Sequence, residues 1–496
     1  MAQPEETSAR TEHAPASAVD ADAQAAGAPA WTGHSTTKRA LFLLGGAVCM
    51  QMTLGTIYSF GSETVYITSW LRQYVDATYA QTMFTFGALQ MAMSISLCIC
   101  GAVLDTRQHL TRIVAIVAAA SMAICVALTS LSRSVLTMVL VYGVMRGASV
   151  GCANMMAVMT GKAWWKHRMG MAQGLIAAAF GLGAFGFNFL FTWLVNPENE
   201  VPLVLDPRDD KEYYALDSQV VQRVPQTLRT MALVYACLGV LGACFLAPPP
   251  GVTRASSKVT ATTTTYLATV KRTVSQKKFW ALLALWILSS TPGHIVIGAN
   301  KVYGGRHIGD DRFLTLVNAV GSLTNGIGRL LAGRLMDKFK IRHLGTVMLI
   351  LQAIFIGTYA SEFVLSSRVL FMVWNIAVYL LYGGMSPTWP LAVVDTFGAK
   401  VFGRVYGMVC LAWGIGGVTG DFLFMFVGEG ASDAALFAIL VVMTLACIPL
   451  AWVFNADPKL RAQGGADAEV NRPLLAEADE ETGSCCLVVY CILCAV

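Results

Sequence analysis

Long hydrophobic runs alternate with short polar stretches over most of this chain. Each run is long enough to form an α-helix across a hydrocarbon layer of about 30 Å. The pattern predicts twelve spans, near residues 40–61, 82–104, 113–131, 135–160, 170–195, 229–247, 279–300, 312–333, 344–361, 367–389, 404–427 and 434–454. We therefore predict an all-α polytopic membrane protein.

The composition argues against several other classes of protein. Hydrophobic residues make up 55% of the chain and charged residues 13%, whereas a soluble domain is about 25% charged. The net charge of +5 does not indicate nucleic-acid binding, because most basic residues lie in short loops between the spans. No set of paired acids, Ser and His, or metal ligands gathers at one depth, so we expect neither an enzyme nor a bound cofactor or metal.

Lysine and arginine in short loops favour the cytoplasmic side of a membrane. The segment 248–278 contains six of them and no acid, and the other basic loops fall on the same side if both termini are cytoplasmic. We predict a disordered N-terminal tail, a six-helix half, a basic cytoplasmic linker, a second six-helix half and a cytoplasmic C-terminal tail, at 1–38, 39–247, 248–278, 279–455 and 456–496.

A short motif recurs at the predicted cytoplasmic end of the second span of each half. Its two copies, Gly-x-x-x-Asp with an adjoining base, comprise Gly101, Asp105 and Arg107, and Gly333, Arg334 and Asp337. Parallel repeats of six spans are a transporter architecture, with the binding site at their interface. The glycine permits close helix approach and the aspartate can cap a helix or bind arginine, so we predict latches of an inner gate. Ordinary capped helix ends are the alternative.

One polar stripe dominates the eighth predicted span. Asn318, Ser322, Asn325 and Arg329 recur at spacings of four, three and four, which places them on one helical face. An arginine within a bilayer costs about 3 kcal/mol unless it faces a cavity or a partner. We predict that Arg329 and Asn325 bind substrate in a central cavity. The alternative is that Arg329 pairs with an acid and holds a closed gate.

Polar residues in other spans are candidates for the same cavity. Tyr58 lies on a stripe of the first span, His294 is deep in the seventh, and Arg146 lies in the fourth within a ridge of glycines. His294 can titrate with a proton or donate to a substrate. For each of them the alternative is a structural role, as helix packing or as a hydrogen bond between helices.

The C-terminal tail ends in an apolar segment too short to span a bilayer. It carries four cysteines, Cys485, Cys486, Cys491 and Cys494, at which S-acylation could anchor the tail to the inner leaflet. An unmodified tail is the alternative. The plasma membrane and an endosomal or lysosomal type of organelle are both compatible with this sequence.

Several motifs give the chain a resemblance to a known family. They are GTIYSFG at 55–61, WWKHRMGMAQG at 164–174, GRLLAGRLMD at 328–337, PLAVVDTFG at 390–398, Tyr406-Gly407 and Ala412-Trp413-Gly414. These runs resemble the major facilitator superfamily and, within it, the oxalate/formate antiporter-like and monocarboxylate transporter-like group. The resemblance covers both halves, and it implies secondary active transport of small organic anions by alternating access.

The resemblance also implies roles for individual residues. The anion-binding arginine of the family falls on Arg329. Proton-coupled monocarboxylate members carry an aspartate where this chain has Asn325, and oxalate-type members a lysine where it has Trp413. A monocarboxylate such as pyruvate or lactate is therefore the expected substrate, in a pocket shaped by Tyr58, His294 and Trp413.

The sequence leaves alternatives open for the mode of coupling and for the class of substrate. Symport with protons through His294, or more weakly Asp421, and exchange of one substrate for another are the two modes of coupling. Two other functions stay open: a carrier of a neutral or zwitterionic nutrient, and a membrane sensor that does not transport.

Overall fold

A computed structural model describes residues 33–104, 108–164, 169–207, 211–247, 270–336, 338–397, 402–428 and 432–454. It divides into two units, residues 1–42 and residues 43–496. The first unit contributes the opening turns of helix α2 (Gly33–Leu54), so helix begins inside the predicted tail 1–38. All packing described below lies within the second unit.

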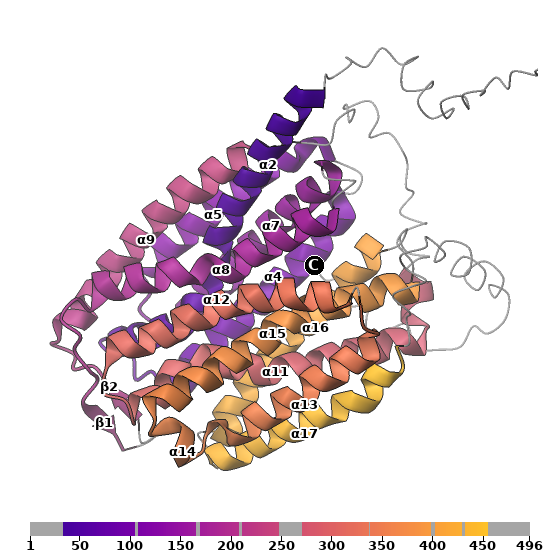
Figure 1. The fold of residues 1–496 in the computed structure, drawn as a ribbon. Helices are drawn as coiled ribbons and strands as arrows, with labels where there is room; N and C mark the ends of the chain where they lie inside the picture. The colour runs from indigo at the N-terminus through magenta and orange to yellow at the C-terminus, as the bar shows by residue number, and fades with distance from the viewer. Residues whose placement is uncertain are drawn as a thin grey trace, which may run out of the picture. The chain divides into compact units, whose positions relative to one another are not determined.

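The first half is almost entirely helical (Figure 1). After α2 its described elements are the 3-10 helix η1 (Gly55–Ser59), α3 (Phe60–Leu71), α4 (Tyr79–Leu104), the 3-10 helix η2 (Gln108–Leu110), α5 (Thr111–Thr129), α6 (Val135–Met138), the π-helix η3 (Val139–Met145), α7 (Arg146–Trp164), α8 (Met169–Val195), the strands β1 (Val204–Asp206) and β2 (Lys211–Tyr213), and α9 (Gln219–Cys244). The two strands form an antiparallel hairpin in which Val204 faces Tyr213.

The second half repeats this succession of long helices. Its described elements are α11 (Lys277–Gly305), α12 (Asp311–Met336), α13 (Ile341–Tyr359), α14 (Glu362–Leu365), α15 (Arg368–Phe397), α16 (Phe402–Leu423), the π-helix η6 (Phe424–Gly428) and α17 (Asp433–Trp452). Ser432 caps the N-terminus of the last helix, because its side chain accepts a hydrogen bond from the Ala435 amide at 3.1 Å.

Eleven of the described helical segments are long and apolar enough to cross a membrane. The eighth predicted span corresponds to α12, a 26-residue helix that is not among these eleven. It carries the polar stripe from Asn318 to Arg329 and charged residues at both ends, which explains its lower hydropathy. The prediction of an all-α polytopic membrane fold is confirmed.

Two pairs of helices make the most extensive contacts between the halves. α4 packs against α16, and α8 packs against α12; Figure 1 shows α12 with α8 on one side and α15 on the other. In a repeat of six spans α4 is equivalent to α12, and α8 to α16. The two contacts are therefore counterparts of each other, as expected of a parallel repeat.

The first span is longer than predicted. We predicted its end at residue 61, before the polar pair Ser62 and Glu63, whereas the helical segment runs from Leu41 to Leu71. Glu63 is buried, and its carboxylate accepts a hydrogen bond of 2.5 Å from the Tyr142 hydroxyl. An acid can lie inside a span when a neighbouring helix supplies such a donor, and sequence position alone did not reveal this donor.

Glycines bring the first span into direct contact with α8. A Cβ atom added to Gly183 would overlap the carbonyl oxygen of Met52, and one added to Gly55 would overlap the carbonyl oxygen of Phe180. The backbones therefore touch at this crossing, as small residues allow in membrane helix packing. The crossing fixes the position of η1, which carries Tyr58, relative to Phe180 of α8.

Gly183→Ala is expected to lower the free energy of unfolding by about 1–3 kcal/mol, because the added methyl group must push the two backbones apart. The thermal unfolding midpoint of detergent-purified protein measures this effect. Gly186→Ala on the same helix is the matched control, since a Cβ there meets nothing within 4 Å. Equal midpoints for the two variants would contradict the tight crossing.

Candidate functional site

Arg329 lies on α12 at the interface between the halves. Its Nη2 donates to the Tyr58 hydroxyl at 2.8 Å, and its Nε donates to Asn325 Oδ1 at 3.2 Å. Tyr58 belongs to the first half and Asn325 to the second, so the guanidinium connects the two. Arg329 is half-buried, and in the described part of the chain no carboxylate lies within ion-pair distance of it.

Aromatic side chains surround this arginine. The guanidinium carbon lies 5.5 Å from the centre of the Phe180 ring. Tyr58 packs edge to face on Phe180 at 5.9 Å and on Tyr382 at 6.5 Å between ring centres. The indole of Trp413 donates a hydrogen bond to the Tyr382 hydroxyl. The structure thus brings Arg329, Asn325, Tyr58 and Trp413 of the predicted site into one connected group.

The opposite end of the α12 stripe has a structural role. Asn318 Nδ2 donates to Ser62 Oγ at 2.7 Å, and its Oδ1 accepts from Asn300 at 3.2 Å and from the Tyr379 hydroxyl. Asn318 therefore links several helices of both halves by hydrogen bonds. This is the structural role that we gave as the alternative to substrate binding for polar residues within spans. Ser322 donates to the carbonyl oxygen of Asn318, one turn earlier in the same helix, at 3.0 Å.

Arg146 lies inside the first half. Its Nη2 donates to Thr56 Oγ1 at 2.9 Å, and its guanidinium carbon lies 4.2 Å from the centre of the Tyr142 ring, whose hydroxyl binds Glu63. The arginine is fully buried, and its Nε and Nη1 have no hydrogen-bond partner among the described residues. All these contacts are within the first half, whereas Arg329 lies between the halves. Substrate contact by Arg146 stays a prediction.

His294 is paired with an acid. Its Nε2 lies 2.8 Å from Asp421 Oδ1, its Nδ1 lies 3.1 Å from Gln90 Oε1, and its ring stacks on Phe86 at 4.5 Å. The other oxygen of Asp421 accepts from the Gly87 amide at 2.9 Å. His294 and Asp421 are both fully buried.

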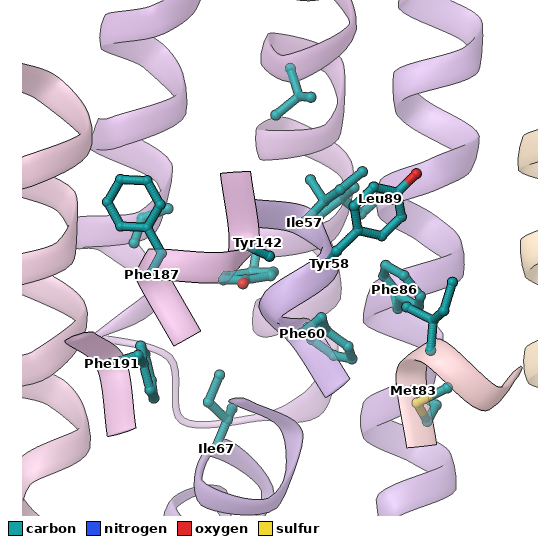
Figure 2. Close-up of a cluster of buried hydrophobic side chains, with 14 of the residues drawn as sticks. Ile57, Tyr58, Phe60, Ile67, Met83, Phe86, Leu89, Tyr142, Phe187 and Phe191 are labelled. Carbon is teal, nitrogen blue, oxygen red and sulfur yellow. The ribbon is translucent and has the colours of Figure 1, made fainter. Parts of the chain in front are cut away.

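Figure 2 places Phe86 beside Phe60, with which it also stacks, in the apolar cluster that contains Tyr58. The histidine pair therefore adjoins the packed interior. It shares a neighbour with the Arg329 group, because Tyr382, which packs on Tyr58, also lies against Gly293 next to His294.

A second ionic cluster closes one end of the interface. Lys301 Nζ lies 2.6 Å from Asp311 Oδ1 and donates to the Tyr66 hydroxyl at 2.7 Å. Asp311 also accepts hydrogen bonds from Tyr66, Asn196 and Tyr214 at 2.5, 2.9 and 3.2 Å. Lys301 and Asp311 belong to the second half and the other three to the first, and all five are buried. We refer to these five residues as the Asp311 cluster.

The predicted latch residues are only partly described. Gly101 is buried near the end of α4, Gly333 is half-buried and Arg334 is exposed. A Cβ added to Gly333 would meet no described atom within 4 Å, so this glycine makes no close helix contact in the present conformation. Asp105, Arg107, Asp337 and the tail cysteines Cys485, Cys486, Cys491 and Cys494 lie outside the described residues.

Sequence reasoning missed two acids of these networks. The predicted first span ends at residue 61 and so leaves Glu63 outside it, although the mostly apolar residues that follow (TVYITSWL) indicate that the span continues. Asp311 was left unassigned, because an acid in the first turn of a helix is common and gives no hint of a partner. Among the described residues, no group of three His, Cys, Asp or Glu side chains is arranged to hold a metal ion.

Comparisons with known proteins agree with this architecture. The family model described as Major Facilitator Superfamily matches residues 220–420 and 302–489, which together exceed half of the chain. The inward-open structure of the xylose transporter XylE from E. coli superposes with a TM-score of 0.62 at 13% identity, over 84% of this chain and 96% of that one.

Two curated proteins are similar in sequence over most of their length. Apicoplast pyruvate carrier 1 of Toxoplasma gondii is 26% identical, with 73% of this chain and 79% of that protein covered. The uncharacterized MFS-type transporter YhjX of Escherichia coli strain K12 is 23% identical, with 75% and 84% covered.

Proposed function

This chain belongs to the major facilitator superfamily of membrane transporters, and within that family we propose that it carries a small organic monoanion, a monocarboxylate of the pyruvate or lactate class. Transport would proceed by alternating access between the two halves. The observation that carries the proposal is Arg329, a half-buried cation between the halves with no acidic partner among the described residues.

The neutral partners of Arg329 support anion binding. Asn325 and Tyr58 each accept one hydrogen bond from the guanidinium, and neither neutralises its charge. A guanidinium has five N–H donors, so donors remain for a carboxylate, which it can bind with two parallel hydrogen bonds. An aspartate at position 325 would instead form an ion pair with Arg329 one helical turn away. Because Asn325 is neutral, the positive charge of Arg329 stays available to pair with an anionic substrate.

The surroundings favour a small molecule with one carboxylate. Phe180, Tyr58, Tyr382 and Trp413 present aromatic surface next to the single cation. Such surroundings suit a short apolar group joined to one anionic group. The pyruvate carrier among the similar proteins supports the same substrate class.

Transport assays with purified protein in proteoliposomes test this proposal. Vesicles are preloaded with one unlabelled solute of a panel: pyruvate, lactate, oxalate, alanine or xylose. The uptake of labelled external pyruvate in exchange for that solute is then measured. We expect saturable exchange with pyruvate and lactate, and little with the dicarboxylate, the zwitterion or the sugar. Absence of uptake of every carboxylate, or equal exchange with xylose, would refute the monocarboxylate assignment.

Tyr58→Phe is expected to raise KM for pyruvate about tenfold with little change in kcat. It removes the hydroxyl that orients Arg329, and a hydrogen bond to a charged group contributes about 1.5–3 kcal/mol. Concentration-dependent initial uptake rates separate KM from kcat. Tyr74→Phe is the matched control, because Tyr74 is exposed outside the spans. An unchanged KM in Tyr58→Phe would show that the hydroxyl does not orient the arginine.

A further inference from the structure

The paired His294 and Asp421 lie where the halves meet. His294 is on α11 and Asp421 on α16, both in the second half, whereas Gly87 and Gln90 are on α4 of the first half. Asp421 therefore contacts His294 with one oxygen and the backbone of the opposite half with the other. The geometry of this group depends on the contact between α4 and α16.

The hydrogen-bond partners constrain the protons on the pair. Ionised Asp421 is an acceptor only, so Nε2 of His294 must donate to it, and Nδ1 faces the carbonyl oxygen of Gln90. When both ring nitrogens carry a proton, the positive charge of the imidazolium cancels the negative charge of the carboxylate. A neutral histidine beside a protonated aspartate gives the same zero net charge. Removing one proton from either arrangement leaves a net charge of −1.

Among the described residues, no other charged side chain faces the pair to compensate that loss. The side chains facing His294 and Asp421 are Phe86 and Gln90 of α4, Thr291 of α11 and, across Gly293, Tyr382 of α15, all uncharged. Charged residues on the elements packed around the pair are Glu63 of α3, Lys277, Lys278 and Lys301 of α11, Asp311, Arg312, Arg329 and Arg334 of α12, Arg368 and Asp395 of α15, Arg404 of α16, and Asp433 of α17.

Two of these buried groups have partners of their own. Lys301, two turns from His294 on α11, pairs with Asp311, and Glu63 accepts a hydrogen bond from Tyr142. A buried charge without a partner costs several kcal/mol. The closed arrangement of α4 against α16 is therefore compatible with a protonated pair and strongly disfavoured for a deprotonated one.

We propose that His294 and Asp421 together form a proton-binding site, and that one proton on this pair is required for the halves to close around it. The proton binds when one side of the interface is open to water and leaves when the other side opens. Each passage through the closed state then carries one proton. This inference rests on the proposed function for the identity of the co-transported solute, a monocarboxylate, and makes the carrier a proton symporter.

Two transport assays in proteoliposomes separate coupling from substrate binding. The first measures uptake of labelled pyruvate driven by an acidic exterior into vesicles without internal pyruvate. The second measures exchange against internal pyruvate at equal pH. Asp421→Asn is expected to retain exchange and to lose the gradient-driven uptake, because Arg329, Asn325 and Tyr58 stay intact while the proton site is lost. His294→Gln is expected to lose the gradient-driven uptake as well. Either variant accumulating pyruvate in response to the gradient would overturn the proposal.

Matched controls come from the same half. Asp433→Asn changes an acid at the start of α17, and His343→Gln changes a histidine of α13 that packs against Trp452. Both are expected to keep exchange and gradient-driven uptake. If both controls lose the gradient response as well, the loss in the test variants is unspecific and the assignment to His294 and Asp421 fails.

A measurement without substrate tests the proton site separately from the proposed function. Wild-type protein and the double variant His294→Gln, Asp421→Asn are titrated in nanodiscs, and bound protons are counted. Wild type is expected to bind one reversible proton per chain more than the double variant over the titrated pH range. Equal proton binding would overturn the site, whatever solute the carrier moves.

Discussion

Replacing Arg329 with alanine is expected to lower kcat/KM for pyruvate uptake about 100-fold. The proposed bond between the guanidinium and the carboxylate lies in partly buried aromatic surroundings, where losing one partner of a charge pair costs about 2–5 kcal/mol. A loss of about 3 kcal/mol corresponds to a factor of about 100. Initial rates of labelled pyruvate uptake into proteoliposomes measure the effect.

The same substitution is expected to leave the protein folded. Arg329 has neutral partners, Tyr58 and Asn325, so its removal leaves no buried acid without a counter-charge. The unfolding midpoint in detergent should therefore stay close to that of the wild type. Had Arg329 served as the structural partner of an acid, the midpoint would fall instead, because breaking a buried ion pair costs about 3–5 kcal/mol.

Two further variants sharpen the Arg329 test. Arg329→Lys keeps the charge but loses the planar arrangement of donors that binds a carboxylate twice, so an intermediate rate is expected. Arg223→Ala is the control, because Arg223 forms a surface ion pair with Glu198 at 3.4 Å, and such pairs contribute little. Normal transport by Arg329→Ala would contradict anion binding at this residue.

The overall architecture could be predicted because a bilayer imposes strong constraints on sequence. Length and hydropathy located the spans, and the spacing of Asn325 and Arg329 placed both on one helical face. The structure agrees on this face and adds what periodicity cannot supply, which is the partner in the other half. Tyr58 lies 271 residues away from Arg329 along the chain, and only the packing of α8 against α12 and η1 brings them together.

Charged residues that pair across helices were harder to predict. His294 was identified from its depth in a span, but its acid, Asp421, lies 127 residues later in another helix. Glu63 was missed because a polar residue near the end of an apolar run resembles the start of a loop. In both cases the pairing depends on which helices adjoin, and a single sequence does not contain that information directly.

The ionic groups of the structure lie in separate networks with separate partners. In the described part of the chain, Arg329 hydrogen-bonds to neutral residues, His294 pairs with Asp421, and Lys301 pairs with Asp311. A carrier that binds an anion and a proton needs one site for each and a contact that closes an end of the path. The three networks match these three tasks, and each can be changed without removing a residue of another.

Asp311→Ala is expected to destabilise the closed end of the interface by about 3–5 kcal/mol, because it leaves Lys301 buried without its counter-charge. It also removes the acceptor that holds Tyr66, Asn196 and Tyr214 of the first half. When this end opens, water solvates Lys301, so the substitution penalises the closed conformation specifically. The ratio of closed to open molecules should fall by a factor of about 100 to several thousand.

Distances across the closed end measure this shift. Spin labels at Leu203 of the first half and Phe363 of the second, both strongly exposed, report the separation by pulsed electron resonance. They are introduced as unnatural amino acids because the chain has 13 cysteines. Asp310→Asn is the neighbouring control, since its ion pair with Arg368 is partly exposed and contributes about 1 kcal/mol or less, and asparagine keeps an oxygen that can accept from Asn199 and from the Phe313 amide. Asp311→Ala should populate longer distances, and the control should not.

A double variant distinguishes loss of the ion pair from general damage. Lys301→Met combined with Asp311→Leu replaces the pair by apolar residues of similar size, which is often neutral or stabilising for buried ion pairs. The closed distance is therefore expected to return in the double variant, although the hydrogen bonds to Asp311 are still absent. If the double variant stays as open as Asp311→Ala, the hydrogen bonds from the first half hold this end closed, and the buried charge of Lys301 is not the cause of opening.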